Sequence, residues 1–507
     1  MARSTQHGES EPEAGWLLAN LVGSALLVKQ PPADQTQLSD LTAPLPRPWQ
    51  PRLALSRLLR RSPYKVAILD DDPTGTQAAK DIDVLLSWDT KTLRTALFSS
   101  ERAFFVLLNS RALPETQAAH LVSRVVHKIG ALAQGCSVPV RFVLRGDSTL
   151  RGHYPSDVQA ARSALNDIGP EIPWTEVHVP AFIAGGRITI GDTQWVVEGR
   201  RAKAVATTEF ARDPVFAFVN SDLKHWIQEK TSGRILASDV MSIGLEDIRS
   251  RSIGRIVQRL AQGGPVNPVV ANAACNQDIT ALTAGVLAAE LLGGRYLFHT
   301  GASFAAAYAG AAGGTGPGHR QLSARLELPA SPRILLAVGS HVDLTTRQLD
   351  VLKTRRDVVS TELRVSNLSH GGAAQEVARV ALLAASSLAK GAVSTVFTSR
   401  SVATGSRAQY QAVAPTVAHH MAQVVAALSD QYDVLITKGG ITASIILTDA
   451  LRADRARVIG QLLPGVPVWK VISGQASSPK CIVIFPGNVG NERSLCEAVR
   501  LLKGARQ

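Results

Sequence analysis

The chain is poor in cysteine, methionine and aromatic residues. Only 4 of its 507 residues are cysteine, and aromatic residues make up 5%. The cysteines lie too far apart for the paired spacing of a zinc site or for a disulfide framework, as is typical of a reducing compartment, and we expect the cytoplasm. With few aromatic residues, the cores should be aliphatic. The four cysteines are Cys136, Cys275, Cys481 and Cys496.

Long apolar runs are also absent. No run reaches the ~18 residues that a membrane-spanning helix needs. The nearest approach, from Trp16 to Val28, is interrupted by Asn20 and begins only after three acidic residues, which is unlike a secretory signal. We therefore expect no membrane partner.

Positive charge is abundant but not concentrated. The formal net charge is +13 and the pI is about 9.8, which permits attraction to anions. The one tight basic cluster is Arg57, Arg60, Arg61 and Lys65, and no aromatic residues are interleaved with it. A nucleic-acid site needs both features on one surface, so we expect no nucleic-acid partner.

The length of the chain predicts two or more domains. Residues 1–61 contain repeated prolines and little periodicity, which predicts a partly disordered N-terminal extension with one helix near Trp16–Val28. Residues 309–332 contain a run of glycines and two prolines, which predicts a flexible linker. This run lacks the Lys-Ser/Thr ending of a phosphate-binding P-loop, and no strand leads into it.

The two regions between these segments, 62–308 and 333–507, alternate strand-like and helix-like patterns. Strands separated by helices require crossover connections and predict parallel sheets. The fold class is therefore α/β, with two α/β domains that have largely parallel sheets. Strands are predicted at 66–69, 82–86, 104–108, 142–144, 177–179, 334–338, 358–363, 393–398, 434–437 and 482–485, and helices at 116–129, 253–261, 374–389 and 414–428.

Three consecutive acids follow the first buried strand of the first domain, in the segment Asp70-Asp71-Asp72-Pro73-Thr74-Gly75. Adjacent carboxylates repel one another and are costly to bury together. At the carboxyl end of a parallel strand they point into the crevice where α/β proteins bind ligands. Carboxylates accept hydrogen bonds from hydroxyl groups and can remove a proton from one, so a hydroxylated ligand suits the cluster. The plainer alternative is a solvated acidic turn that caps a helix.

A second strand end in the same domain carries Arg145, Asp147, Ser148 and Arg151 within seven residues. Arginine binds carboxylates and phosphates with two parallel hydrogen bonds, whereas Asp and Ser suit sugar hydroxyls. The combination favours a small acidic, hydroxylated ligand. The alternative is a capped helix start, with Asp147 or Ser148 as the cap and Arg151 in solvent.

The second domain has three Gly-rich strand ends, each before a predicted helix. They are Gly339-Ser340, Gly439-Gly440-Ile441-Thr442 and Gly487-Asn488-Val489-Gly490. Glycine lets backbone N–H groups approach a ligand closely, and helix N-termini favour phosphate. Three such turns in one domain predict a nucleotide site, although one alone would be an ordinary turn. Lys438 either adds a charge to a phosphate or is solvated.

These motifs resemble the four-carbon acid sugar kinases, a family that includes 3-oxotetronate, threonate and erythronate kinases. The resemblance covers residues 62–503 and rests on ordered motifs in both domains. Its matches are Asp71, Asp72, Thr74 and Gly75 to Asp-Asp-x-Thr-Gly; 147–152 to Asp-Ser-Thr-Leu-Arg-Gly; Phe210, Ala211, Asp213 and Pro214 to Phe-Ala-x-Asp-Pro; and the three Gly-rich turns of the second domain.

The resemblance implies that the first domain binds a short sugar acid and the second binds ATP. Phosphoryl transfer, with Mg²⁺, would take place in the cleft between them. It gives catalytic candidates Asp72, Asp147 and Arg151, with the base left open between the two acids, and it leaves the metal ligands unknown. Arg145 and Arg151 would take the substrate carboxylate or developing phosphate charge. Substrate-binding candidates are Asp71, Thr74, Gly75, Arg145, Ser148 and Arg187; nucleotide-binding candidates are Ser340, Gly439, Gly440, Ile441, Thr442, Gly487 and Asn488.

Two positions depart from the family pattern. Ala184 stands where members commonly carry Glu in Pro-Glu-x-Gly-Arg, and Ile441 stands where many carry Glu in Gly-Gly-Glu-Thr. The alternative function is therefore a catalytically degenerate protein that binds nucleotide or sugar acid without transferring phosphate. The identity of the acid and the assembly state stay open, with a homo-oligomer as one option.

Overall fold

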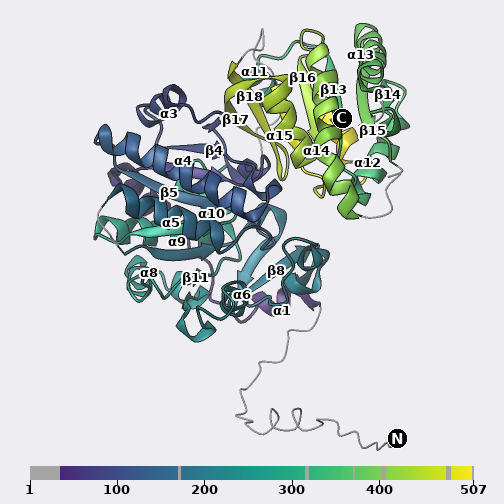
Figure 1. Ribbon diagram of the computed structural model, residues 1–507. Helices are drawn as coiled ribbons and strands as arrows, with labels where there is room; N and C mark the ends of the chain where they lie inside the picture. Colours follow the sequence, from purple (N-terminus) through teal and green to yellow (C-terminus); the bar gives the residue numbers. More distant parts are fainter. Residues whose placement is uncertain are drawn as a thin grey trace, which may run out of the picture.

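The protein has two lobes, a larger one built from the first half of the chain and a smaller one from the second half (Figure 1). The helix predicted near Trp16–Val28 lies outside the described residues. The structure is a computed structural model, and it describes residues 35–169, 173–313, 319–368, 371–400, 407–474 and 481–504.

The first domain has a parallel sheet at its centre, in the order β10-β11-β6-β12-β5-β2-β4-β3. Every pairing between neighbours in this run is parallel. Its strands are β2 (Lys65–Asp70), β3 (Ile82–Leu85), β4 (Ala103–Leu107), β5 (Val140–Arg145), β6 (Thr175–Val179), β10 (Met241–Ile243), β11 (Val269–Ala271) and β12 (Tyr296–Thr300).

Helices cover both faces of this sheet because its strands are apolar on both sides. Val66 and Ile68 of β2 belong to one hydrophobic core, and Ala67 and Leu69 belong to the other. The first core includes residues of α7 (Leu245–Ile248), α8 (Ile253–Leu260), α9 (Asn276–Leu291) and α10 (Ala302–Tyr308); the second includes residues of α3 (Thr90–Leu97), α4 (Glu115–Gly135), α5 (Ser156–Ile168) and α6 (Leu223–Lys230).

The second domain repeats this architecture with the strand order β19-β16-β13-β15-β14, again parallel throughout. Its strands are β13 (Ile334–Val338), β14 (Val358–Leu363), β15 (Val393–Thr398), β16 (Val434–Lys438) and β19 (Cys481–Phe485). One face packs on α13 (Ala373–Ala389), α14 (Arg407–Ala427) and α15 (Gly440–Ile445), and the other packs on α11 (His319–Leu326), α12 (Asp343–Lys353) and α16 (Ser494–Leu502).

A long hairpin joins the two domains into one continuous sheet. Strand β17 (Ala453–Leu463) pairs antiparallel with β3 of the first domain, and β18 (Val466–Gly474) pairs antiparallel with β19 of the second. Within the described residues this sheet has 15 strands. The predicted fold class, two α/β domains with largely parallel strands, is confirmed. The hairpin was not predicted, because periodicity within a strand does not reveal a partner hundreds of residues away.

A small antiparallel sheet lies at the edge of the first domain, in the order β1-β9-β8-β7. Its first strand comes from the segment predicted as an extension. That segment also packs on the first domain: α2 contacts α9, and Trp49 Nε1 donates to the Ile248 carbonyl at 2.7 Å. The elements are β1 (Thr36–Gln37), α1 (Leu38–Thr42), α2 (Arg52–Arg61), β7 (Arg187–Ile190), β8 (Thr193–Glu198) and β9 (Arg201–Ala204).

The segment predicted as a linker contains helix α11, although five of its residues, 314–318, lie outside the described part of the chain. Arg325 of α11 pairs with Asp81 of the first domain and donates to the Ile459 carbonyl of β17 at 2.9 Å. The connection is therefore tied to both domains. Among the described residues, no helix is both long and apolar enough to cross a membrane.

Candidate active site

The acidic triplet lies at a topological switch point of the first domain. Strand β2 is flanked by β4 on one side and by β5 on the other, and the chain passes from β4 to β5 across it. Ligands bind at such points in open α/β sheets, beyond the carboxyl ends of the strands. Asp71 and Asp72 follow β2, Arg111 follows β4, and Asp147 follows β5.

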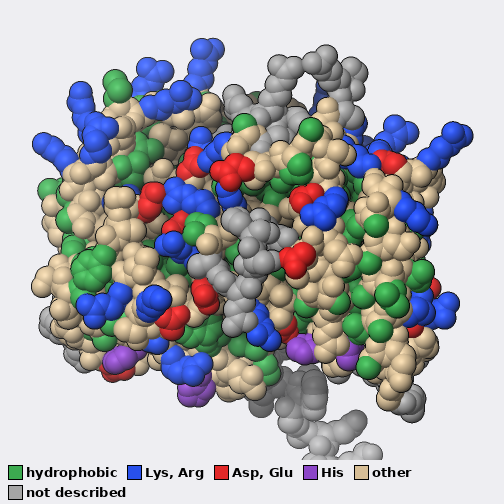
Figure 2. Space-filling view, turned by 90° about the horizontal axis from the view of Figure 1, so that it is seen from above, with side chains coloured by type: hydrophobic (Ala, Val, Ile, Leu, Met, Phe, Trp, Pro, Cys, Tyr) green, Lys and Arg blue, Asp and Glu red, His purple; other side chains and the backbone are tan. Residues whose placement is uncertain are grey.

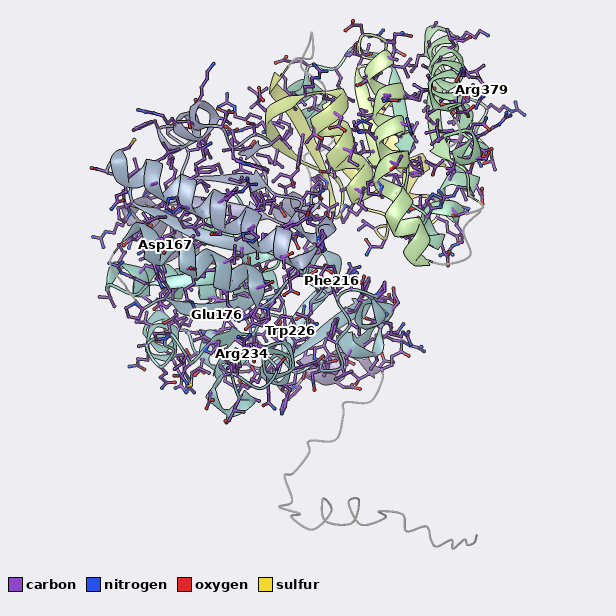
Figure 3. All side chains as sticks on the ribbon, in the orientation of Figure 1. Asp167, Glu176, Phe216, Trp226, Arg234 and Arg379 are labelled. Carbon is purple, nitrogen blue, oxygen red and sulfur yellow. The ribbon has the colours of Figure 1, made fainter. Side chains whose placement is uncertain are left out.

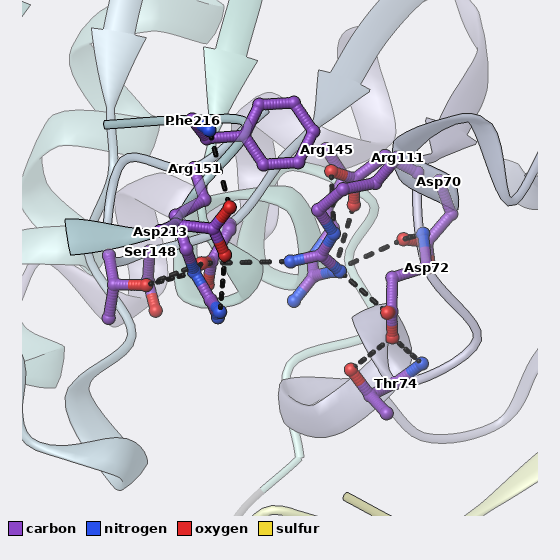
Figure 4. A network of polar contacts seen from close by, with 12 residues as sticks. Asp70, Asp72, Thr74, Arg111, Arg145, Ser148, Arg151, Asp213 and Phe216 are labelled. Carbon is purple, nitrogen blue, oxygen red and sulfur yellow. Dashed lines mark hydrogen bonds and ion pairs between the residues drawn. The ribbon is translucent and has the colours of Figure 1, made fainter. Parts of the chain in front are cut away.

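Arg111 holds the acids of these strand ends together (Figure 4). Its guanidinium lies 2.7 Å from Asp72 Oδ2, 3.5 Å from Asp71 Oδ2 and 3.6 Å from Asp147 Oδ2. Arg111 was not among the predicted site residues, although it follows a predicted strand just as the acids do. Its carboxylate partners lie on other strands, so only the folded sheet brings them together.

Arg145 and Arg151, which the resemblance assigns to the substrate carboxylate or to developing phosphate charge, are paired with acids of the protein. Arg145 Nη1 lies 3.3 Å from Asp70 Oδ1 and 3.4 Å from Asp71 Oδ1. Arg151 Nε lies 2.7 Å from Asp147 Oδ2, and its Nη1 lies 3.8 Å from Asp213 Oδ2. The structure therefore brings Asp213 of the Phe-Ala-x-Asp-Pro segment into the same network.

Four acids of this network have shifted pKa values. Burial raises the pKa of Asp70 to about 7, against the opposing effect of Arg145. Burial also raises the pKa of Asp71 to about 6, against Arg111 and Arg145. Asp72 and Asp147 experience the same burial, but Arg111 and hydrogen bonds from Thr74 hold the pKa of Asp72 below its ordinary value, and Arg151 and Arg111 do so for Asp147. Asp72 and Asp147 are thus carboxylates at neutral pH.

The turn after β2 fixes Asp72. The Thr74 amide and hydroxyl both donate to Asp72 Oδ1, at 2.8 and 2.5 Å. Gly75 packs directly on the carboxylate of Asp70, because a Cβ on Gly75 would lie 1.9 Å from the Asp70 carboxylate oxygens. These two predicted substrate-binding residues therefore shape the acid turn itself. Ser148 is buried, and its carbonyl accepts from Gln194 Nε2 at 2.8 Å.

A buried aromatic layer supports the loop that carries Asp147 and Arg151. Tyr154, at the end of this loop, stacks on Trp226 with ring centroids 4.8 Å apart, and it packs edge-on against His178. His178 in turn contacts Glu176, with 2.6 Å between Nε2 and Oε1. Figure 3 places Glu176 and Trp226 inside the body of the first domain. The loop therefore rests on packed side chains.

The Gly-rich turns of the second domain lie at its own switch point, since β13 is flanked by β15 and β16. Gly439 has φ +117°, a conformation that favours glycine. A Cβ on Gly339 would lie 2.2 Å from Thr442 Oγ1, and one on Gly487 would lie 2.6 Å from Ser340 Oγ. The three turns therefore touch one another and expose backbone toward one site, as a phosphate cradle requires.

Side chains of the predicted nucleotide site divide into two groups. Ser340 and Thr442 stabilise the turns: Ser340 Oγ accepts from Thr345 Oγ1 at 3.1 Å, and Thr442 is buried against Gly339. Ile441 and Asn488 are exposed. Lys438 is neither solvated nor aimed at a ligand, because it is fully buried and its Nζ donates to the Pro486 carbonyl at 2.6 Å. Burial lowers its pKa to about 6.

The two halves of the site meet in one cavity of about 1650 Å³. The first domain contributes the segment 182–187 with Phe210, and the second contributes its Gly-rich turns and part of α14. Asp72 adjoins the cavity at Gly440, since a Cβ on Gly440 would lie 2.9 Å from Asp72 Oδ2. Pockets for one small ligand usually measure about 300–1,000 Å³, so this cavity has room for a nucleotide and a second molecule.

The described residues offer no preformed metal site, since no group of three or more His, Cys, Asp or Glu side chains is placed to hold an ion. The carboxylates of the arginine network beside the cavity are paired, whereas Glu198, Glu209, Asp343 and Glu497 line the cavity itself. Mg²⁺ is commonly held by one or two carboxylates together with substrate phosphates, so it would bind here with the nucleotide.

The surface around the lobes shows no single charged face in the view of Figure 2. Lys and Arg side chains are spread across it, with Asp, Glu and apolar side chains between them. The positive net charge of the chain is therefore distributed on this side of the molecule.

The fold and the site together define a two-domain α/β protein with a ligand cleft between an acid-rich and a glycine-rich domain. Comparison with protein families identifies both halves. Residues 66–308 match the family of sugar-binding N-terminal domains, and residues 335–495 match the family of nucleotide-binding C-terminal domains. The chain belongs to the proteins that combine these two domains. This supports the domain composition of the predicted family and does not identify the substrate.

Solved structures share this fold at low sequence identity. A Salmonella typhimurium LT2 protein with a provisional tRNA synthase name is 17% identical, with a TM-score of 0.60; the match covers 86% of this chain and 99% of that one. Haemophilus influenzae protein HI1011 is also 17% identical, with a TM-score of 0.57, and the match covers 86% and 100% of the two chains. At this identity the likeness concerns the fold alone. A search of curated proteins gave no match.

Proposed function

We propose that the protein is an ATP-dependent kinase that phosphorylates a hydroxyl group of a short, four-carbon sugar acid. One observation carries the proposal: the ionised carboxylate of Asp72 lies against Gly440, in the turn that would cradle the nucleotide phosphates. A group that binds hydroxyls thus adjoins a group suited to phosphate. The pairing of a sugar-binding domain with a nucleotide-binding domain supports the same function.

In the proposed reaction, the acceptor hydroxyl donates a hydrogen bond to Asp72. Its oxygen attacks the γ-phosphorus of ATP, the bond from that phosphorus to the bridging oxygen breaks, and ADP leaves. The proton of the hydroxyl passes to Asp72. Asp72 is preferred over Asp147 as the base because Asp72 Oδ2 would lie 2.9 Å from a Cβ on Gly440, whereas no Asp147 atom is among the nearest neighbours of the corresponding position at any glycine described in the Gly-rich turns of the second domain. Mg²⁺ would neutralise charge on the transferring phosphoryl group.

The test is an ADP-release assay with ATP, Mg²⁺ and a panel of four-carbon sugar acids, followed by identification of the product. Asp72→Asn keeps the shape of the side chain and removes the base, so turnover should fall by about 10²–10⁴-fold. Asp350→Asn is the matched control, because Asp350 is an exposed acid on α12. Turnover that survives in Asp72→Asn, with Asp350→Asn unaffected, would contradict the assigned base.

One observation favours the second candidate, a binding protein without transferase activity. Ala184 lines the cavity at the position where the resembled family commonly has an acid. Such a protein should gain thermal stability with nucleotide and sugar acid but release no ADP. Turnover above background with any acid of the panel would exclude this candidate.

A further inference from the structure

The cavity contains two positively charged side chains that differ in their partners. Among the described residues that line it, Arg187 and Arg347 are the only Lys or Arg. Arg347 is paired with Glu492, with 3.0 Å between Nε and Oε1. Arg187 donates to the carbonyl of Gly185 in its own turn and lies 5.8 Å from the centre of the Phe210 ring. Within the described chain, no carboxylate oxygen lies within 4 Å of its guanidinium nitrogens.

The other three arginines near the site are already neutralised. Arg111, Arg145 and Arg151 each pair with two or three carboxylates, and these carboxylates belong to Asp70, Asp71, Asp72, Asp147 and Asp213. More carboxylates than arginines meet there, so the network does not attract a further anion. A substrate carboxylate placed against it would meet at least two ionised acids. A second positive site is therefore needed to hold the acid group of the substrate.

The backbone holds Arg187 toward the cavity. Arg187 begins β7 and is paired in register with Val196 of β8. The turn before it contains Gly186, which has φ +72°, and a Cβ there would lie 2.5 Å from the Val197 carbonyl oxygen. Only glycine fits this position, so the turn and the strand that follows it are fixed together. Burial lowers the pKa of Arg187, whereas the charges of Asp147 and of the cavity-lining Glu198 and Glu209 raise it, and an arginine keeps its charge at neutral pH.

We propose that Arg187 binds the carboxylate of the substrate, and that the acceptor hydroxyl extends from there toward Asp72 and Gly440. Arg145 and Arg151 then organise the acids and do not bind the substrate carboxylate. The inference rests on the proposed function for the identity of the second ligand, the nucleotide. It assigns the substrate class as a hydroxy acid with a carboxylate at one end and the acceptor hydroxyl at a distance from it.

The experiment measures binding in the absence of nucleotide, so that it does not depend on turnover. Calorimetric titrations compare D-erythronate and L-threonate with erythritol and threitol, the uncharged alcohols of the same length. Wild-type protein should bind at least one acid more tightly than its alcohol. Arg187→Gln should weaken binding of that acid by roughly tenfold to a hundredfold and leave the alcohol within about twofold, since a charge-assisted pair is lost. Arg187→Lys should recover part of the loss.

Two controls separate this role from other effects. Arg201→Gln removes an exposed arginine from the same small sheet and should leave acid binding unchanged. A titration of each variant with ATP and Mg²⁺ tests the other anion that Arg187 could hold, a nucleotide phosphate. Circular dichroism melting curves verify that each variant is folded.

Three results would overturn the proposal: wild-type protein that binds no acid in preference to its alcohol, Arg187→Gln that keeps the preference, or Arg187→Gln that loses ATP binding and keeps acid binding. A wrong kinase assignment would give a different set of results from a wrong role for Arg187. Acid binding would then depend on Arg187 as expected, but no acid of the panel would be phosphorylated.

Discussion

At the scale of single residues, Asp70 is the acid of the triplet with the most unusual environment. Its side chain is 1% exposed, it is packed against Gly75, and it pairs with Arg145 at 3.3 Å. Asp71 and Asp72 face the network around Arg111, which leads to the cavity wall. The three neighbours thus divide into one buried structural acid and two site acids.

The burial of Asp70 predicts a pH dependence of stability. Its pKa is about 7 in the folded protein and 3.8 in the unfolded chain, so the folded state binds more protons between these values and the free energy of unfolding falls as pH rises through this range. Asp70→Asn should remove this contribution, which has a slope of at most ~1.4 kcal/mol per pH unit. Urea unfolding of both proteins from pH 4.5 to 7.5 measures it. Equal slopes would show that Asp70 is ionised throughout, and Asp350→Asn provides the exposed-acid control.

At the scale of elements, the β17–β18 hairpin connects the chemistry of the two domains. Trp469 of β18 is fully buried, and its Nε1 donates to Thr76 Oγ1 at 2.9 Å. Thr76 lies in the turn that follows Asp72, within the 3-10 helix Gly75–Ala78. A strand of the nucleotide-binding half therefore holds the acid turn of the sugar-binding half.

This contact predicts coupling between Trp469 and Thr76. Trp469→Phe and Thr76→Val each remove one partner of a buried hydrogen bond and should each lower the free energy of unfolding by about 1–3 kcal/mol. The double variant should lose less than the sum of the two, because the bond is broken only once. Urea unfolding of the four proteins measures this.

Trp226→Phe is the matched control for that cycle. Trp226 is also buried, but within the described chain its Nε1 has no hydrogen-bond partner. Combined with Thr76→Val, it should give an additive loss. Additivity in the Trp469 cycle as well would show that the contact carries no coupling.

Strands of both central sheets could be predicted from the sequence. Strands predicted at 66–69, 334–338 and 393–398 correspond to β2, β13 and β15, since apolar runs bounded by turn residues indicate buried strands. The hairpin and the small sheet were not predicted from the sequence. Strand β17 of the hairpin contains the charged residues Arg455 and Arg457, and their partners, Asp83 and Glu101, belong to the other domain.

At the scale of the whole molecule, the continuous sheet limits how far the domains can move independently. Two domains of one chain are usually expected to move relative to each other unless their interface is extensive. Here β17 pairs with β3, and ion pairs from Arg457 to Asp83 and Glu101 cross the same boundary, both at 2.9 Å. The two domains are thus joined along this boundary by strand pairing and by ion pairs. Figure 3 shows Arg379 of α13 on the side of the second domain that faces away from the first domain.

Both domains should therefore unfold in one transition. Scanning calorimetry should give a single peak, and a non-hydrolysable ATP analogue with Mg²⁺ should raise the midpoint of the entire peak, since ligand binding stabilises the cooperative unit that contains the site. Arg457→Ala should weaken the boundary and broaden or split the peak. Two peaks in the wild-type protein, with the analogue shifting only one, would contradict the expected cooperativity.

The chemistry of the strand ends and the alternation that produces two α/β domains could be read from the order of residues along the chain. Both are local properties: periodicity reports burial, and turn residues report where strands end. Which charges neutralise one another depends on the folded arrangement of the strands. This arrangement added Arg111 to the site, engaged Arg145 and Arg151 with acids, buried Lys438, and left Arg187 facing the cavity with no ion pair within the part of the chain that the structure describes. Ion pairing depends on distances between residues far apart in the chain, and those distances exist only after the sheet has formed.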